Sequence, residues 1–84
     1  MKYSAVTGAY SSLGNDLIAE CQKTNSLETL DSIEAEFKGI HTMFVRIMTH
    51  CTDEEIVKMR RVRENAFAAF DKARKDAFIR LTKI

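Results

Sequence analysis

The sequence contains no proline and no tryptophan, and only three of its 84 residues are glycine. Proline and glycine interrupt helices more strongly than other residues, so a chain with so few of them can be almost entirely helical. Long apolar runs are also absent, because the longest, residues 66–70, falls far short of the roughly 20 residues that a membrane-spanning helix needs. We therefore expect a helical protein with no membrane partner.

Neither sign of charge dominates, since 13 lysine and arginine residues stand against 12 aspartate and glutamate residues, for a formal net charge of +1. The total charge therefore indicates no acidic or basic partner. Hydrophobic residues make up 45% and charged residues 30%, which is typical of a globular domain and not of a disordered chain. A core this small supplies only about 3–5 kcal/mol, so we expect association with a second copy or another protein.

Features that mark export, catalysis or metal binding are equally scarce. Residues 1–8 lack the long apolar core of a signal peptide, so we expect a cytoplasmic protein whose cysteines, Cys21 and Cys51, stay reduced and unbridged. Glycine-rich phosphate loops, nucleophile elbows and HExxH motifs are absent, which predicts no enzyme, no catalytic residue, no cofactor and no small-molecule substrate. The cysteines, His41 and His50 lack the paired short spacings of zinc ligands, so no metal site is expected. We expect His41 to be a hydrogen-bonded core residue and His50 a solvated turn residue.

Apolar residues recur at helical spacing in three segments, at about residues 10–23, 26–50 and 53–82. The stripe of the first segment consists of Tyr10, Leu13, Leu17, Ile18 and Cys21. Gly8 and Gly14 each cost about 1 kcal/mol in a helix, which leaves the chain before this segment unassigned.

The second segment carries the longest apolar stripe. Its members alternate at spacings of three and four: Leu30, Ile33, Phe37, Ile40, Phe44, Ile47 and Cys51. This heptad pattern is typical of helices that pack side by side at a shallow crossing angle. Asn25, followed by Glu28, is the expected N-cap. The stripe is widened by Leu27, Met43, Val45 and Met48. A wide apolar arc predicts neighbours on more than one side, and so a central position for this helix.

The third segment has the clearest start signal, with Thr52 as the expected N-cap and Glu55 three residues later in a capping box. The turn before it spans only residues 50–52, which is short enough to fold the second and third helices into a hairpin. The predicted fold class is all-α: an antiparallel helical hairpin of two long helices with a shorter N-terminal helix packed on it. Residues 1–84 then form a single domain, a three-helix bundle that self-associates.

The apolar face of the third helix divides into two strips. A small-residue strip, which we expect to pack closely on the second helix, contains Val62, Ala66, Ala69 and Ala73. Beside it lies what we call the phenylalanine–arginine strip: Arg60, Arg63, Phe67, Phe70, Arg74, Phe78 and Leu81. Aromatic and arginine side chains are enriched at protein interfaces, so these residues are the candidate partner-binding site.

The phenylalanine–arginine strip has a second interpretation, in which the phenylalanines fill the core and the arginine stems lie along it. In an antiparallel hairpin that turns near Thr52, Arg74 falls opposite Glu28 or Asp31 and is able to pair with either. The sequence leaves both interpretations open.

A basic cluster provides the alternative function, because Lys58, Arg60, Arg61 and Arg63 are candidate nucleic-acid-binding residues. Their spacing, however, sends them in different directions around a helix. The preferred hypothesis is a small non-enzymatic protein–protein interaction module. Such a module oligomerises, most simply as a dimer, or docks on a larger protein to regulate or inhibit it, as accessory proteins of bacteria and their viruses often do. The alternative is a nucleic-acid or nucleoprotein modulator that acts through residues 58–63.

Overall fold

The computed structural model describes residues 3–83, which form three α-helices: α1 (Tyr3–Lys23), α2 (Leu27–Met48) and α3 (Asp53–Thr82). No strand occurs among these residues, so the predicted all-α fold class is confirmed. None of the described helices combines the length and the apolar character that crossing a membrane requires.

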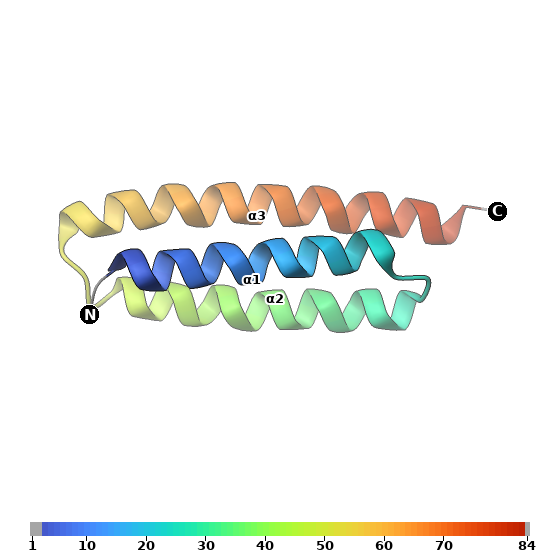
Figure 1. The fold of residues 1–84 in the computed structure, drawn as a ribbon, viewed down its shortest axis with the longest axis horizontal. Helices are drawn as coiled ribbons and strands as arrows, with labels where there is room; N and C mark the ends of the chain where they lie inside the picture. The colour runs from blue at the N-terminus through green and yellow to red at the C-terminus, as the bar shows by residue number, and fades with distance from the viewer. Residues whose placement is uncertain (1–2, 84) are drawn as a thin grey trace.

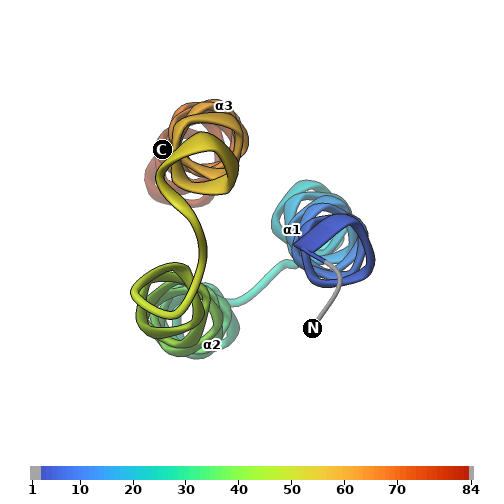
Figure 2. The same cartoon turned by 90° about the vertical axis from the view of Figure 1, so that its left-hand side faces the viewer.

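The helices lie side by side along the long axis of a molecule that measures 49 × 17 × 16 Å. Figure 1 shows that the chain turns back after α1 and again after α2, and Figure 2 shows the helices at the corners of a triangle. Each helix contacts the other two. α2 thus has neighbours on two sides, as predicted, but it is not central, and it leaves Leu27 and Met43 exposed.

α1 begins at Tyr3, well before the predicted start near Tyr10. Neither glycine interrupts it: Gly8 is exposed, and a Cβ built on the buried Gly14 would lie 3.9 Å from a ring carbon of Phe37. Val6 packs against the buried residues that α1 shares with the other helices. Tertiary packing of the apolar stripe thus outweighs the low helix propensity of glycine.

The ends of α2 differ from those predicted. Ser26, and not Asn25, is the N-cap, because its side-chain oxygen accepts a hydrogen bond from the Thr29 amide at 3.3 Å. α2 then ends at Met48 and is followed by the C-cap Thr49, whose hydroxyl donates to a carbonyl of the last turn at 2.6 Å. The connection to α3 is correspondingly longer than the sequence indicated.

The predicted capping box at the start of α3 is confirmed. The Thr52 amide donates to Glu55 Oε1 at 2.9 Å, and the Glu55 amide donates to Thr52 Oγ1 at 3.3 Å. The hydrogen bond from the Thr52 backbone is the main reason that the pKa of Glu55 is lowered. At its other end, α3 contacts α1 through Arg80, which donates to the carbonyls of Cys21 and Gln22 at 3.0 and 3.3 Å. Arg80 therefore satisfies carbonyls at the C-terminal end of α1.

The core consists of two clusters of buried side chains. The cluster near the α1–α2 connection contains Leu17, Cys21, Leu30, Ile33, Phe37, Phe70 and Ala77. The cluster near the α2–α3 connection contains Tyr10, Phe44, Met48 and Met59. A stacked aromatic pair with ring centroids 4.1 Å apart lies in each: Phe37 with Phe70, and Tyr10 with Phe44. The α2 stripe supplies residues to both clusters: Leu30, Ile33 and Phe37 to the first and Phe44 to the second.

The small-residue strip of α3 faces α1 and not α2, so the prediction of its partner is wrong. Ala66 and Ala69 lie along a groove whose other wall includes Ser11 and Gly14 of α1. Small side chains on both helices permit close approach here, whereas α2 and α3 are joined through the large Phe37–Phe70 stack. The small side chains of the strip indicated close packing against another helix, but they did not identify that helix.

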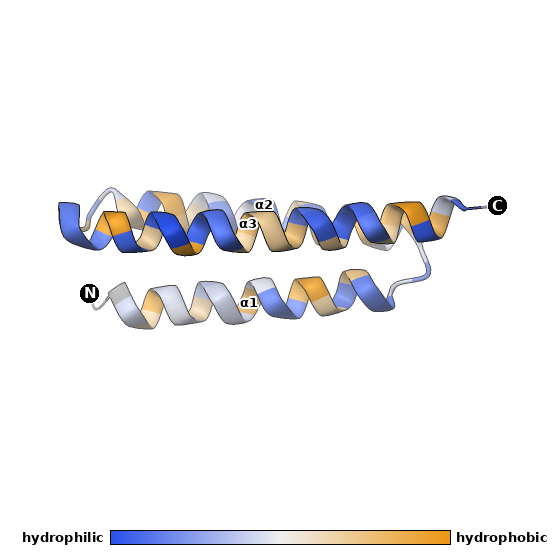
Figure 3. Ribbon diagram, turned by 90° about the horizontal axis from the view of Figure 1, so that it is seen from above, coloured by the Kyte–Doolittle hydropathy of each residue, from blue (hydrophilic) through white to orange (hydrophobic). Residues whose placement is uncertain are grey.

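The three helices differ in the hydropathy of their residues (Figure 3). α3 carries many strongly hydrophilic residues along its length, whereas the N-terminal half of α1 stays near neutral in hydropathy. Residues 3–15 include no aspartate, glutamate, lysine or arginine. A partner that covered this half of α1 would therefore desolvate no charged side chain of α1.

Candidate functional site

The phenylalanine–arginine strip does not form one continuous surface. Phe70 is only 3% exposed because it stacks on Phe37, and Leu81 packs against the same core cluster. Phe70 is therefore a core residue of this chain, whereas Leu81 is only partly buried and its part in partner binding stays a prediction. Phe67 and Phe78 are 52% and 49% exposed, so the core interpretation holds for Phe70, while the interface interpretation stays a prediction for the exposed part of the strip.

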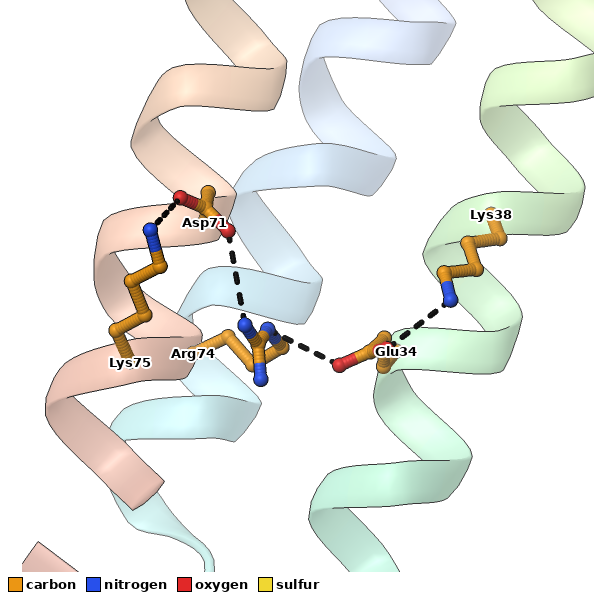
Figure 4. Close-up of polar contacts among 5 residues, drawn as sticks. All are labelled: Glu34, Lys38, Asp71, Arg74 and Lys75. Atoms are coloured by element: carbon orange, nitrogen blue, oxygen red, sulfur yellow. Dashed lines mark ion pairs between the residues drawn. The ribbon is translucent and has the colours of Figure 1, made fainter. Parts of the chain in front are cut away.

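Arg74 is engaged within the chain (Figure 4). Its guanidinium lies 3.0 Å from Glu34 of α2 and 3.7 Å from Asp71 of α3, while Lys38 and Lys75 complete the network at 3.1 and 2.8 Å. The predicted partners of Arg74, Glu28 and Asp31, are wrong because the actual register places a later residue of α2 opposite it. The hydrogen bond from Lys75 is the main cause of the lowered pKa of Asp71, and Arg74 adds to it.

Near the middle of the molecule, His41 lies among aromatic rings. Its Nδ1 is 3.1 Å from the Tyr10 hydroxyl, and its ring centroid is 5.9 Å from that of the exposed Phe67. Burial is the main cause of the lowered pKa of His41, and the positive charge of Arg63 lowers it further. His41 is thus hydrogen-bonded, as the sequence predicted, but it is partly buried and not a core residue. Arg63 is half-buried and Arg60 is exposed.

Of the remaining candidate metal ligands, only His50 and Cys51 are neighbours in the chain. Cys21 is buried and Cys51 is partly buried, both are free thiols, and His50 is exposed in the turn before α3. Burial, and secondarily the charge of Glu20, raises the pKa of the Cys21 thiol. Among residues 3–83, no group of three or more histidine, cysteine, aspartate and glutamate side chains is placed to hold a metal ion.

The basic cluster surrounds a buried residue. Lys58, Arg60 and Arg61 are exposed, whereas Met59, within the same run, has no exposed surface at all. Met59 is a core residue that the sequence analysis missed because its neighbours are all charged. Its distance of seven residues from Ala66, and of eleven from Phe70, was the available signal.

An apolar groove between α1 and α2 is the feature that sequence reasoning did not find. It has a volume of about 290 Å³ and is lined by Val6, Ala9, Tyr10, Leu13, Ile40, Met43, Phe44 and Ile47. Every lining side chain is aliphatic, aromatic or a thioether. Leu13 is 45% exposed and Met43 is 64% exposed, although both belonged to stripes that were expected to face the interior. Their exposure follows from the position of α3, which covers only one side of the α1–α2 pair.

We compared the chain with models of protein families, with curated proteins and with solved structures, and none of them matches it.

Proposed function

We propose that this chain is a three-helix bundle, with α2 and α3 as an antiparallel hairpin, that acts as a non-enzymatic protein–protein interaction module. Its binding surface is the apolar groove between α1 and α2, and through it the protein self-associates or docks on a larger protein to regulate or inhibit that protein. The observation that carries the proposal is the exposure of Leu13 and Met43 beside a groove with a wholly apolar lining.

The physical reason is the cost of leaving such a surface in water. Burying apolar surface contributes about 25 cal/mol per Å², and grooves of this kind are used to hold the apolar face of a helix. The uncharged N-terminal half of α1 forms one wall, so a helix that docks there meets no buried charge on that side. Two free cysteines fit a reducing compartment, and we place the protein's action in the cytoplasm.

The test replaces one groove residue and one matched residue outside the groove. Met43→Glu places a charge beside the groove, whereas Val57→Glu places it on α3 at a site that is 66% exposed, close to the 64% of Met43. We expect the unmodified protein and the Val57→Glu variant to associate, and the Met43→Glu variant to lose association at least tenfold in Kd. Sedimentation of the purified protein and capture of purified candidate partners measure this, and circular dichroism confirms that both variants are folded.

Two results would contradict the proposal. One is that Met43→Glu and Val57→Glu leave every protein–protein association of the chain equally intact. The other is that the chain binds nucleic acid in a gel shift and loses this binding in the Arg60→Glu/Arg61→Glu variant, which would favour the basic cluster as the functional site.

A further inference from the structure

The outer face of α2 presents four exposed residues, one of which, Met43, lines the apolar groove: Glu36, Gly39, Met43 and Arg46. Their spacings are three, four and three residues, which places them on one side of the helix. The order is symmetrical about His41. Glu36 and Arg46, which carry opposite charges, each lie five residues from His41, and Gly39 and Met43 each lie two residues from it. When two such faces lie antiparallel, each residue of one face is therefore opposite a residue of complementary charge or size in the other.

The two charged residues of this face are unpaired within the part of the chain that the structure describes. The ion pairs among residues 3–83 involve Glu34, Lys38, Asp71, Arg74 and Lys75, and neither Glu36 nor Arg46 takes part in them. Glu36 and Arg46 are ten residues apart, which corresponds to about 15 Å along the helix. A single partner helix that runs in the opposite direction is able to reach both of them.

The glycine and the methionine are complementary in size. A Cβ built on Gly39 would have no heavy atom within 4 Å, so the surface there is open. Met43 projects beside it and is 64% exposed. A methionine from a facing helix fits above a glycine, because the missing side chain lets the two helices approach closely.

We infer that α2 is the contact helix of a homodimer in which α2 packs antiparallel to α2 of a second copy, with the two-fold axis at the level of His41. Glu36 then faces Arg46 of the second copy, and Gly39 faces Met43 of the second copy. The inference rests on the proposed function and specifies its partner. It commits to a second copy because a two-fold contact requires a surface that is complementary to itself, and both the charge pattern and the size pattern of this face meet that requirement.

The decisive experiment exchanges the charges. In Glu36→Arg, and equally in Arg46→Glu, each residue faces a like charge in the homodimer, so we expect the dimer Kd to rise about 10- to 100-fold. The double variant Glu36→Arg/Arg46→Glu restores both pairs and should dimerise like the unmodified protein. An equimolar mixture of the two single variants should form a heterodimer, because both facing charge pairs in it are of opposite sign. Sedimentation velocity at low salt measures each case.

The size complementarity has its own matched control. Gly39→Ala and Gly8→Ala both replace an exposed helical glycine that has no heavy atom within 4 Å of the built Cβ. Both should raise the thermal stability of the monomer, since alanine is the better helix former. Only Gly39→Ala should weaken the dimer, by about tenfold in Kd.

Two outcomes would overturn this inference, and they differ from those that would overturn the proposed function. If the unmodified protein dimerises but the two single charge variants and their mixture behave like it, the antiparallel α2 contact is wrong, although a groove-mediated dimer survives. If the unmodified protein stays monomeric at millimolar concentration, a second copy does not bind this face. Binding of a different protein that is lost in the Met43→Glu variant would still support the proposed function.

Discussion

At the scale of single residues, His41 has the most instructive environment. It is partly buried between Tyr10 and Phe67, and the half-buried Arg63 is the nearby cation that opposes its protonation. Both burial and Arg63 favour the neutral ring, so the folded state holds the pKa of His41 below its ordinary value of 6.5. The folded chain therefore favours the neutral ring, and protonation acts against folding.

This predicts that stability depends on pH in a defined direction. Between the lowered pKa of folded His41 and the value of 6.5, the unfolded chain binds more protons than the folded chain. The contribution of His41 is therefore complete above pH 6.5 and is lost as the pH falls through that interval. We expect the urea midpoint to be lower at pH 5.5 than at pH 7.5, and His41→Gln to reduce this difference. His50→Gln, which changes the exposed histidine, serves as the control and should leave the difference unchanged.

An equal pH dependence in His41→Gln and in the unmodified protein would contradict this assignment. It would mean that carboxylates, and not the imidazole, dominate the titration in this range.

Individual residues also show what the sequence was able to predict. The α2 stripe and the Thr52–Glu55 capping box were predictable because both depend on spacing within one segment. Met59 was missed because its immediate neighbours are charged, and the exposure of Met43 was missed because spacing alone does not say where the covered arc ends. The candidate groove depends on the angle at which three helices meet, which no local pattern encodes.

At the scale of elements, the contact between α1 and α3 shows how the helices are matched. Gly14 of α1 lines a groove whose opposite wall carries small residues of α3. The small-residue strip was predicted to meet α2, but α2 instead contributes large aromatic rings to its contact with α3. The pairing of helices thus follows the sizes of the facing side chains. Predicting it requires a comparison of two helices, which the pattern within one segment does not provide.

Gly14→Ala is expected to stabilise the protein despite the burial of this position. The added methyl group would lie 3.9 Å from the Phe37 ring, which is an ordinary van der Waals distance. Alanine gains about 1 kcal/mol over glycine in a helix, so the melting temperature should rise by a few degrees. Thermal unfolding followed by circular dichroism measures this. A lower melting temperature than in the unmodified protein would show that α1 and its neighbours are too close to admit even a methyl group.

At the scale of the whole molecule, a thin elongated shape limits the core. The extents of 49 × 17 × 16 Å leave much of each helix exposed to solvent, and the core is divided into two clusters along the axis. A chain of this size has little stability to spare, so the association that we propose for the α1–α2 side would add directly to its stability.

The unfolding temperature should accordingly depend on protein concentration. Only the folded chain is able to dimerise, so dimerisation stabilises the folded state by mass action. We therefore expect the melting temperature to rise over a hundredfold increase in protein concentration. The Glu36→Arg variant should show little or no such rise. A melting temperature that is independent of concentration in the unmodified protein would indicate that the folded chain gains nothing from a second copy.

The guanidinium of Arg80 holds the carbonyl oxygens of Cys21 and Gln22, which are far from it in sequence. Proteolytic trimming of the last turn of α3 would thus expose the final carbonyls of α1 to solvent as well. Damage confined to the C-terminal tail would then spread by fraying to the first helix, and the first connecting loop would become the next site open to cleavage.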